Sequence, residues 1–202
     1  MRNRPEDRGF TLIEVLISLA LLSVVLGALY SSFFTVQRAL QRFDSVSLKY
    51  QEARTALDIM RREIESSFLK TGEKAKDMTL FEIRDRDVFG KSTSSISLTS
   101  FSFKGYNTNA VSYFVRENNG RLDLFRTEAP AGIKDKGYTL EVMENIEGFT
   151  VETLFNNKWV RTWNTAETEK LPELVRVSIE FEDNRKTVTL TEYARPMTGK
   201  QL

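Results

Sequence analysis

Hydrophobic positions divide this chain into a long helical first third and a strand-rich remainder. An apolar run fills residues 10–29, and Glu14 is its only formal charge. About 20 apolar residues in a helix are enough to cross the hydrocarbon core of a bilayer. The pattern therefore predicts a transmembrane helix over residues 10–30, preceded by a short charged segment, residues 1–9.

A helical period continues beyond the apolar run, because apolar residues recur every three or four positions, as on one face of a helix. No proline falls between Phe10 and Phe68, and Gly72 is a plausible stop signal. We therefore expect residues 31–70 to continue the helix and to cover one face of a sheet. A coiled coil is the alternative, since the mean spacing is close to 3.5. The apolar stripe consists of Phe33, Val36, Leu40, Phe43, Val46, Tyr50, Ala53, Leu57, Met60, Ile64 and Phe68, and the polar face carries Gln41, Lys49, Gln51, Arg54, Arg61, Arg62, Glu63 and Glu65.

The period changes to two after residue 77, which indicates antiparallel strands with one buried face. The clearest strand, residues 175–181, alternates apolar and polar residues, and residues 188–193 form its expected hairpin partner. Other predicted strand segments lie at 96–103, 110–115 and 122–124, with a tight turn at 118–120 and loops at 72–76 and 90–95. We predict an α+β protein: a long N-terminal helix packed on a β-rich globular domain, residues 71–202, made of two sheets or of one sheet with an extension.

Composition excludes several kinds of chemistry. The chain has no cysteine and no histidine, which removes disulfides, Cys-His and Ser-His catalysis and every histidine-containing metal site. The formal net charge is +1, and the first nine residues alone carry +1, so the remainder is neutral. A neutral chain does not favour nucleic-acid binding, which needs clustered Lys and Arg.

Residues 9–16, Gly-Phe-Thr-Leu-Ile-Glu-Val-Leu, carry the most specific motif. The motif and the apolar helix behind it resemble the class III signal of type IV pilins and type II secretion pseudopilins. The resemblance implies that a prepilin peptidase cleaves between Gly9 and Phe10, that Phe10 becomes N-methylated, and that Glu14 pairs with a neighbouring subunit during assembly. An ordinary signal anchor is the alternative, but no A-x-A-like cleavage site follows the apolar run.

The C-terminal half narrows this resemblance. Two tryptophans, Trp159 and Trp163, precede the segment Leu-Pro-Glu-Leu-Val-Arg-Val-Ser-Ile-Glu-Phe at 171–181, and the order is similar to that of J-type minor pseudopilins. The J-type resemblance implies a non-enzymatic subunit of the tip complex that initiates pseudopilus assembly for protein export across the outer membrane. Its implied partners are I- and K-type minor pseudopilins, the major pseudopilin, the prepilin peptidase and the inner-membrane assembly platform. The alternatives are a W-like minor pilin of a type IV pilus and a membrane-anchored periplasmic binding module or enzyme.

Basic residues predict the orientation of the membrane helix. Arg2, Arg4 and Arg8 precede the span, and the side of a membrane protein richer in Lys and Arg is normally cytoplasmic. We therefore expect a single-pass inner-membrane protein, in contact with lipid, whose C-terminal domain lies in the periplasm.

Three groups of polar or aromatic residues are candidate ligand or catalytic sites. Glu82, Asp85 and Asp87 offer oxygen ligands for calcium but lack the glycine-punctuated loop of a dedicated site. Sugar stacking on Trp159 and Trp163 is less common than packing in this arrangement. Glu141, Glu144 and Glu147 are spaced for one face of a helix, which would suit a pair of catalytic carboxylates, but a solvated surface is the commoner arrangement. We interpret all three groups as surface or packing residues and predict no catalytic residue, metal site or cofactor.

Overall fold

The computed structural model describes residues 10–69, 79–88, 90–101, 108–131, 137–183 and 185–196, without the side chains of residues 41–47. Contacts divide the chain into two compact units, Met1–Ser47 and Leu48–Leu202. We call the second unit the head. The predicted loop at 72–76 lies outside the described residues.

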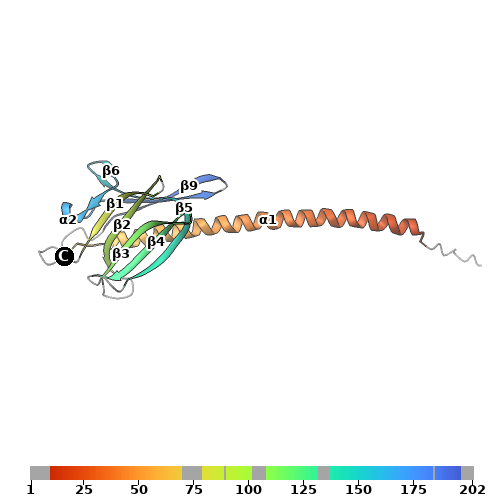
Figure 1. The fold of residues 1–202 in the computed structure, drawn as a ribbon, viewed down its shortest axis with the longest axis horizontal. Coiled ribbons are helices and arrows are strands. Elements are labelled where there is room, and N and C mark those ends of the chain that lie inside the picture. The colour runs from red at the N-terminus through yellow and green to blue at the C-terminus, as the bar shows by residue number, and fades with distance from the viewer. Residues whose placement is uncertain are drawn as a thin grey trace, which may run out of the picture. The chain divides into compact units, whose positions relative to one another are not determined.

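A long helix is followed by a strand-rich region, which is the predicted α+β architecture (Figure 1). All neighbouring strands of the main path pair antiparallel, as expected. The elements are α1 (Leu12–Glu65), β1 (Phe81–Val88), β2 (Lys91–Phe101), β3 (Thr108–Asn118), β4 (Arg121–Pro130), β5 (Tyr138–Phe155), β6 (Lys158–Val160), β7 (Trp163–Asn164), α2 (Thr165–Thr168), β8 (Val175–Asp183) and β9 (Lys186–Ala194).

The last four turns of α1 cover the sheet of the head with the predicted apolar stripe. Ala53, Leu57, Met60 and Ile64 are buried in one core with the strands. Fully burying a Leu, Ile or Met side chain stabilises a fold by roughly 1.5–3 kcal/mol. Tyr50 belongs to the same stripe and packs edge-on against Phe181 of β8, with ring centroids 5.0 Å apart. The stripe therefore packs on a sheet here, rather than on a second helix as in a coiled coil.

Helix α1 ends at Glu65, earlier than the predicted end at residue 70. The chain leaves the helix in order to pair with β2: Ser67 forms a β-bridge with Ser100, and the Phe68 amide donates to the Thr99 carbonyl. Phe68 is buried as expected, but from an extended segment and not from the helix. Backbone pairing with a strand thirty residues later therefore overrides the local helical pattern.

The strands of the described residues form one nine-stranded sheet rather than two sheets. Its order is β7-β1-β2-β3-β4-β5-β8-β9, with β6 paired to β5. A single parallel bridge, Thr93 to Phe149, also joins β2 to β5. Because β2 pairs with both β3 and β5, the sheet folds back on itself.

Two predicted hairpins are present. Strands β3 and β4 meet at a two-residue turn in which Asn119 and Gly120 both have positive φ, 53° and 78°. Such φ values are required by type I′ turns, which favour Asn-Gly. Strands β8 and β9 pair from Asp183–Lys186 to Val175–Ala194. Tyr193 lies opposite Arg176 and so faces away from the predicted apolar stripe.

The predicted loop at 90–95 is wrong beyond Gly90, because β2 already begins at Lys91. Its serines and threonines gave a loop-like composition, but Thr93 and Ser94 are buried. The Ser94 hydroxyl accepts a hydrogen bond from the Val151 amide at 3.0 Å. A buried polar side chain needs a hydrogen-bond partner, and the backbone of β5 supplies one here. The polar residues of this segment can therefore lie in a buried strand.

Candidate functional site

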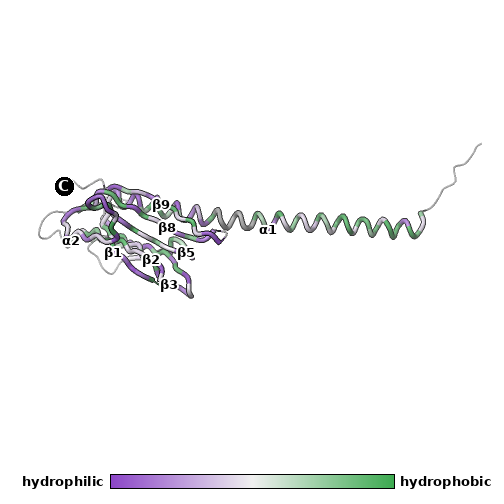
Figure 2. Tube along the Cα trace, turned by 90° about the horizontal axis from the view of Figure 1, so that it is seen from above, coloured by the Kyte–Doolittle hydropathy of each residue, from purple (hydrophilic) through white to green (hydrophobic). Residues whose placement is uncertain are grey.

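The N-terminal part of α1 can serve as a membrane anchor. Residues Leu12–Leu40 are long and apolar enough to cross a membrane, with a mean hydropathy of 2.6 over the most apolar stretch. Figure 2 shows hydrophobic positions along this part of the helix. The hydroxyls of Ser18, Ser23 and Thr35 donate to carbonyls one turn earlier. These donors are thus satisfied inside the helix, as a lipid environment requires.

Glu14 lies in the first turn of α1, where it forms a capping box with Thr11. Its Oε2 accepts from the Thr11 amide at 3.0 Å and from the Thr11 hydroxyl at 3.1 Å, while the Glu14 amide donates to Thr11 Oγ1 at 3.4 Å. The positive end of the helix dipole also favours an anion here. The Thr-x-x-Glu spacing is a known sequence signature of this cap, so the cap could have been predicted from the sequence alone.

The capping box leaves part of the carboxylate available. Both donors bind Oε2, and no donor among the described residues binds Oε1. Phe10, directly before the cap, is 85% exposed. Gly9, the other half of the predicted cleavage site, lies outside the described residues.

A buried ion pair links the last turn of α1 to the sheet. Glu63, which the sequence pattern placed on the polar face, is only 3% exposed. Its carboxylate accepts from Arg126 Nη2 of β4 at 2.5 Å and from the Tyr113 hydroxyl of β3 at 2.6 Å. Arg126 also pairs with Glu128 at 2.7 Å. The prediction for Glu63 is wrong because its partners are supplied by strands fifty and more residues away.

Burial and pairing act in opposite directions on this cluster. Burial raises the pKa of Glu63 above its usual value, although hydrogen bonds from Arg126 and Tyr113 oppose the shift. Burial alone would lower the pKa of Arg126, but the bonds to Glu63 raise it instead. Burial and the Glu63 charge raise the pKa of Tyr113. A carboxylate held by two donors is a poor general base, so the cluster serves to fix the helix on the sheet.

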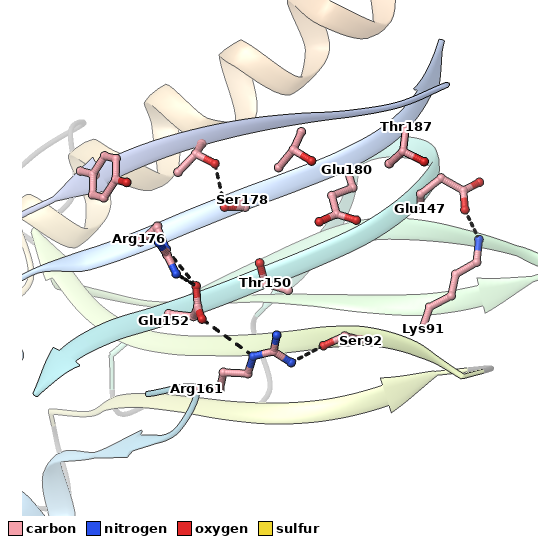
Figure 3. Close-up of a pocket in the computed structure, with 13 residues that line it drawn as sticks. Lys91, Ser92, Glu147, Thr150, Glu152, Arg161, Arg176, Ser178, Glu180 and Thr187 are labelled. Carbon is pink, nitrogen blue, oxygen red and sulfur yellow. Dashed lines mark hydrogen bonds and ion pairs between the residues drawn. The ribbon is translucent and has the colours of Figure 1, made fainter. Parts of the chain in front are cut away.

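A polar pocket of about 600 Å³ lies on the sheet face opposite α1. Figure 3 shows side chains of β5 and β8 pointing into it, with Glu152 between two arginines. Glu152 is 2.5 Å from Arg176 Nη2 and 3.8 Å from Arg161 Nε, and Lys91 pairs with Glu147. Because Lys91, Arg161 and Arg176 are each paired with a glutamate, the basic side chains that line the pocket do not form an open anion site.

The glutamates at 141, 144 and 147 do not lie on a helix, and that prediction is wrong. All three belong to β5, which is interrupted by a bulge where Asn145 has a φ of 51°. Glu141 contacts Glu144, whereas Glu147 reaches Lys91 of β2. The extended conformation of this segment is determined by pairing with β4 and β8, and not by the helix-like spacing of its three glutamates.

The remaining candidate residues have structural partners. Trp159 packs on Arg176, whose Cζ is 4.3 Å from the ring centroid, and Trp163 packs edge-on against Phe155. The calcium candidates lie on β1, where Glu82 pairs with Arg84 and Asp87 accepts from the Gly90 amide. Within the described ranges, no group of three or more acidic residues is placed to hold a metal ion.

Comparisons with known proteins identify the family. The model of type II secretion system protein J matches residues 31–192, and the model of the prokaryotic N-terminal methylation motif matches residues 4–30. No curated protein sequence matches the chain. The match to protein J favours the type II system over the W-like pilin alternative.

Two solved structures have a distantly similar fold. One chain of the GspK–GspI–GspJ complex from the enterotoxigenic Escherichia coli type 2 secretion system is 11% identical, covers 76% of this chain and 99% of its own length, and has a TM-score of 0.49. A type IV-like pilin from Thermus thermophilus is 9% identical, with coverages of 74% and 96% and a TM-score of 0.49. These likenesses are too weak to add to the family assignment, which rests on the match over residues 31–192: the chain belongs to the protein J family of the type II secretion system and is a minor pseudopilin.

Proposed function

We propose that this minor pseudopilin acts at the tip of the pseudopilus, where it joins I- and K-type subunits and primes assembly without catalysing a reaction. The observation that carries the proposal is Glu14, a single carboxylate at the start of an apolar helix of membrane length. A charge within a membrane segment costs about 2.5–3.5 kcal/mol on insertion scales and normally marks a functional residue.

In this proposal a prepilin peptidase cleaves between Gly9 and Phe10 and methylates the new N-terminus. The anchor then holds the chain in the inner membrane, with the head in the periplasm, until the assembly platform transfers it to the growing pseudopilus. Leaving lipid requires an equally apolar surface, which the helices of the major pseudopilin and of the other minor subunits supply.

Glu14 aligns the subunits during this transfer. Its free Oε1 can accept from the protonated N-terminal amine of a neighbouring subunit, and a methylated amine keeps that charge. Such a pair contributes register more than net stability, because the attraction is offset by desolvation of both charges.

The capping box suggests a test that separates the charge from the cap. Glu14→Gln preserves the capping box, since glutamine can replace glutamate at this position, but removes the charge. Glu14→Ala removes both, and Thr11→Ala weakens the cap while keeping the charge. We expect both Glu14 variants to lose secretion and co-purification with the other minor pseudopilins, and Thr11→Ala to resemble wild type. Each variant would replace the native chain in a secreting strain.

Intact-mass analysis of the membrane-extracted chains provides the control, because all three variants should be processed and inserted normally. Normal secretion with Glu14→Gln, together with defects in Glu14→Ala and Thr11→Ala, would reduce Glu14 to a helix cap. Full secretion in a strain that lacks the gene would refute the proposed function altogether.

A further inference from the structure

The head carries an apolar groove that its own side chains leave open. The groove has a volume of about 690 Å³ and lies between α1 and the first residues of β5, with the Glu63–Arg126 pair at its floor. Leu48 and Ile59 line it from the helix and are 55% and 38% exposed, and Leu140 lines it from β5 and is 52% exposed. Exposed apolar side chains that gather in one depression mark interaction surfaces more often than scattered ones do.

The helical wall of the groove has the geometry of a helix-packing surface. Leu48, Thr55 and Ile59 all line the groove and are separated by seven and four residues. Positions with this spacing form one ridge along a helix, against which a second helix can pack. This ridge lies on a different side of α1 from the buried stripe, so both can be used at once.

The rim of the groove has unbalanced negative charge. Glu52 lines the helical side and Glu141 the strand side, and Glu141 contacts Glu144. This contact raises the pKa of Glu141. In contrast, the basic residues of the groove are occupied: Arg62 pairs with Asp58 at 2.7 Å, and Arg126 pairs with Glu63 and Glu128. In the described part of the chain, no basic side chain forms an ion pair with Glu52, Glu141 or Glu144.

We propose that this groove binds an amphipathic helix of another minor pseudopilin, with apolar side chains against Leu48, Ile59 and Leu140 and a Lys or Arg beside Glu141 and Glu144. Apolar anchors at i, i+3 or i+4 and i+7 are the usual pattern of helix-in-groove recognition. A basic side chain of the partner would offset the repulsion between these two carboxylates, so the groove would favour helices that carry a Lys or Arg at this position. This inference rests on the proposed function, because it names the surface through which the partners bind.

Crosslinking can map the occupant, since the chain has no cysteine of its own. Ile59→Cys and Leu140→Cys would be introduced into the full chain and co-expressed with the other minor pseudopilins of the same system, each carrying single cysteines along its helix. We expect crosslinks from both positions to one face of one partner helix. Phe155→Cys is the matched control, because Phe155 is 50% exposed but lies outside the groove.

Two groove variants test the chemistry. Leu140→Arg, and the double reversal Glu141→Lys with Glu144→Lys, should each lower co-purification of the partner by about tenfold or more, as loss of an interface hot spot does. Phe155→Arg should leave it unchanged. A Lys→Glu or Arg→Glu change at the crosslinked position of the partner should restore binding to the charge-reversed chain. Thermal unfolding of every variant verifies that the head is folded.

The outcomes separate the two proposals. If wild-type chain co-purifies with no other pseudopilin, the proposed function fails. If it does co-purify, but the groove variants bind as well as wild type, this inference is overturned while the proposed function stands. Crosslinks from Ile59 and Leu140 to a second copy of this chain would identify a self-association surface and also overturn it. Unchanged binding after charge reversal would refute the basic partner.

Discussion

Replacing Arg126 by methionine should destabilise the head far more in the wild-type chain than in a Glu63→Gln background. Glu63 and Arg126 side chains are 4% and 13% exposed, so the pair is mostly shielded from water. Two unit charges about 4 Å apart attract by about 4 kcal/mol at an effective dielectric constant of about 20. Removing one partner of a buried pair costs about 3–5 kcal/mol, because the other charge is left desolvated. We therefore expect Arg126→Met to cost about 3–5 kcal/mol.

The Glu63→Gln background removes the orphaned charge. Glutamine still offers Tyr113 a hydrogen-bond acceptor, so the hydroxyl stays satisfied. Arg126→Met should then cost only about 1–2 kcal/mol, because it loses an ordinary hydrogen bond and the partly exposed ion pair with Glu128. The difference between the two backgrounds is the coupling energy of the pair.

The cost of Arg126→Met should also depend on pH. Burial already raises the pKa of Glu63 above 4.5, and loss of Arg126 removes one of the effects that lower it. A carboxyl whose pKa is raised by folding stabilises the fold below its unfolded pKa and loses this contribution as the pH rises. The deficit should therefore be largest at pH 7 and shrink as the pH falls toward about 4.5.

Urea unfolding of the full chain in detergent, followed by tryptophan fluorescence, provides the measurement. Both tryptophans of the chain, Trp159 and Trp163, lie in the head, so the signal reports its unfolding. Arg84→Met is the matched control, because Arg84 pairs with Glu82 at 2.9 Å but is 67% exposed. It should cost no more than about 1 kcal/mol. An equal cost of Arg126→Met in both backgrounds would refute the argument.

Two further predictions concern processing and the core. Gly9→Leu should block removal of residues 1–9 and methylation of Phe10 without preventing membrane insertion, and intact mass would show the retained leader; a normally trimmed variant would contradict the predicted junction. Leu57→Asp should destabilise the head by several kcal/mol because it buries an unpaired charge, whereas Gln51→Asp, at an exposed position, should change the unfolding free energy little. Equal unfolding midpoints for these two variants would mean that Leu57 is not part of the core.

Sequence periodicity was sufficient wherever a segment is amphipathic by itself. The stripe through Ala53, Leu57, Met60 and Ile64 and the alternation of β8 were both predicted because each repeats the period of its own element. The β3–β4 turn was predicted for a similar reason: Asn-Gly favours positive φ whatever surrounds it. Each of these features depends mainly on residues close together in the sequence, so the local pattern was enough to predict it.

Periodicity failed where a distant partner decides the outcome. Glu63 looks like a surface residue until Arg126 and Tyr113 are placed beside it, and residues 91–95 resemble a loop until Ser94 meets the backbone of β5. The apolar groove was missed for the same reason, since Leu140 and Ile59 are more than eighty residues apart in sequence. A pattern on one segment cannot reveal a surface that two segments form together.

The two glutamates at opposite ends of α1 illustrate how position along a helix decides what a carboxylate needs. Glu14 lies in the first turn, where free backbone amides and the positive end of the dipole stabilise it, so a single threonine completes its local environment. Glu63 lies near the last turn, where the negative end of the dipole and burial both oppose an anion. It therefore depends on Arg126 and Tyr113. In a head without disulfides, this dependence makes the ion pair a link between α1 and two strands. Glu14 needs no such distant partner, and among the described residues no donor binds its Oε1.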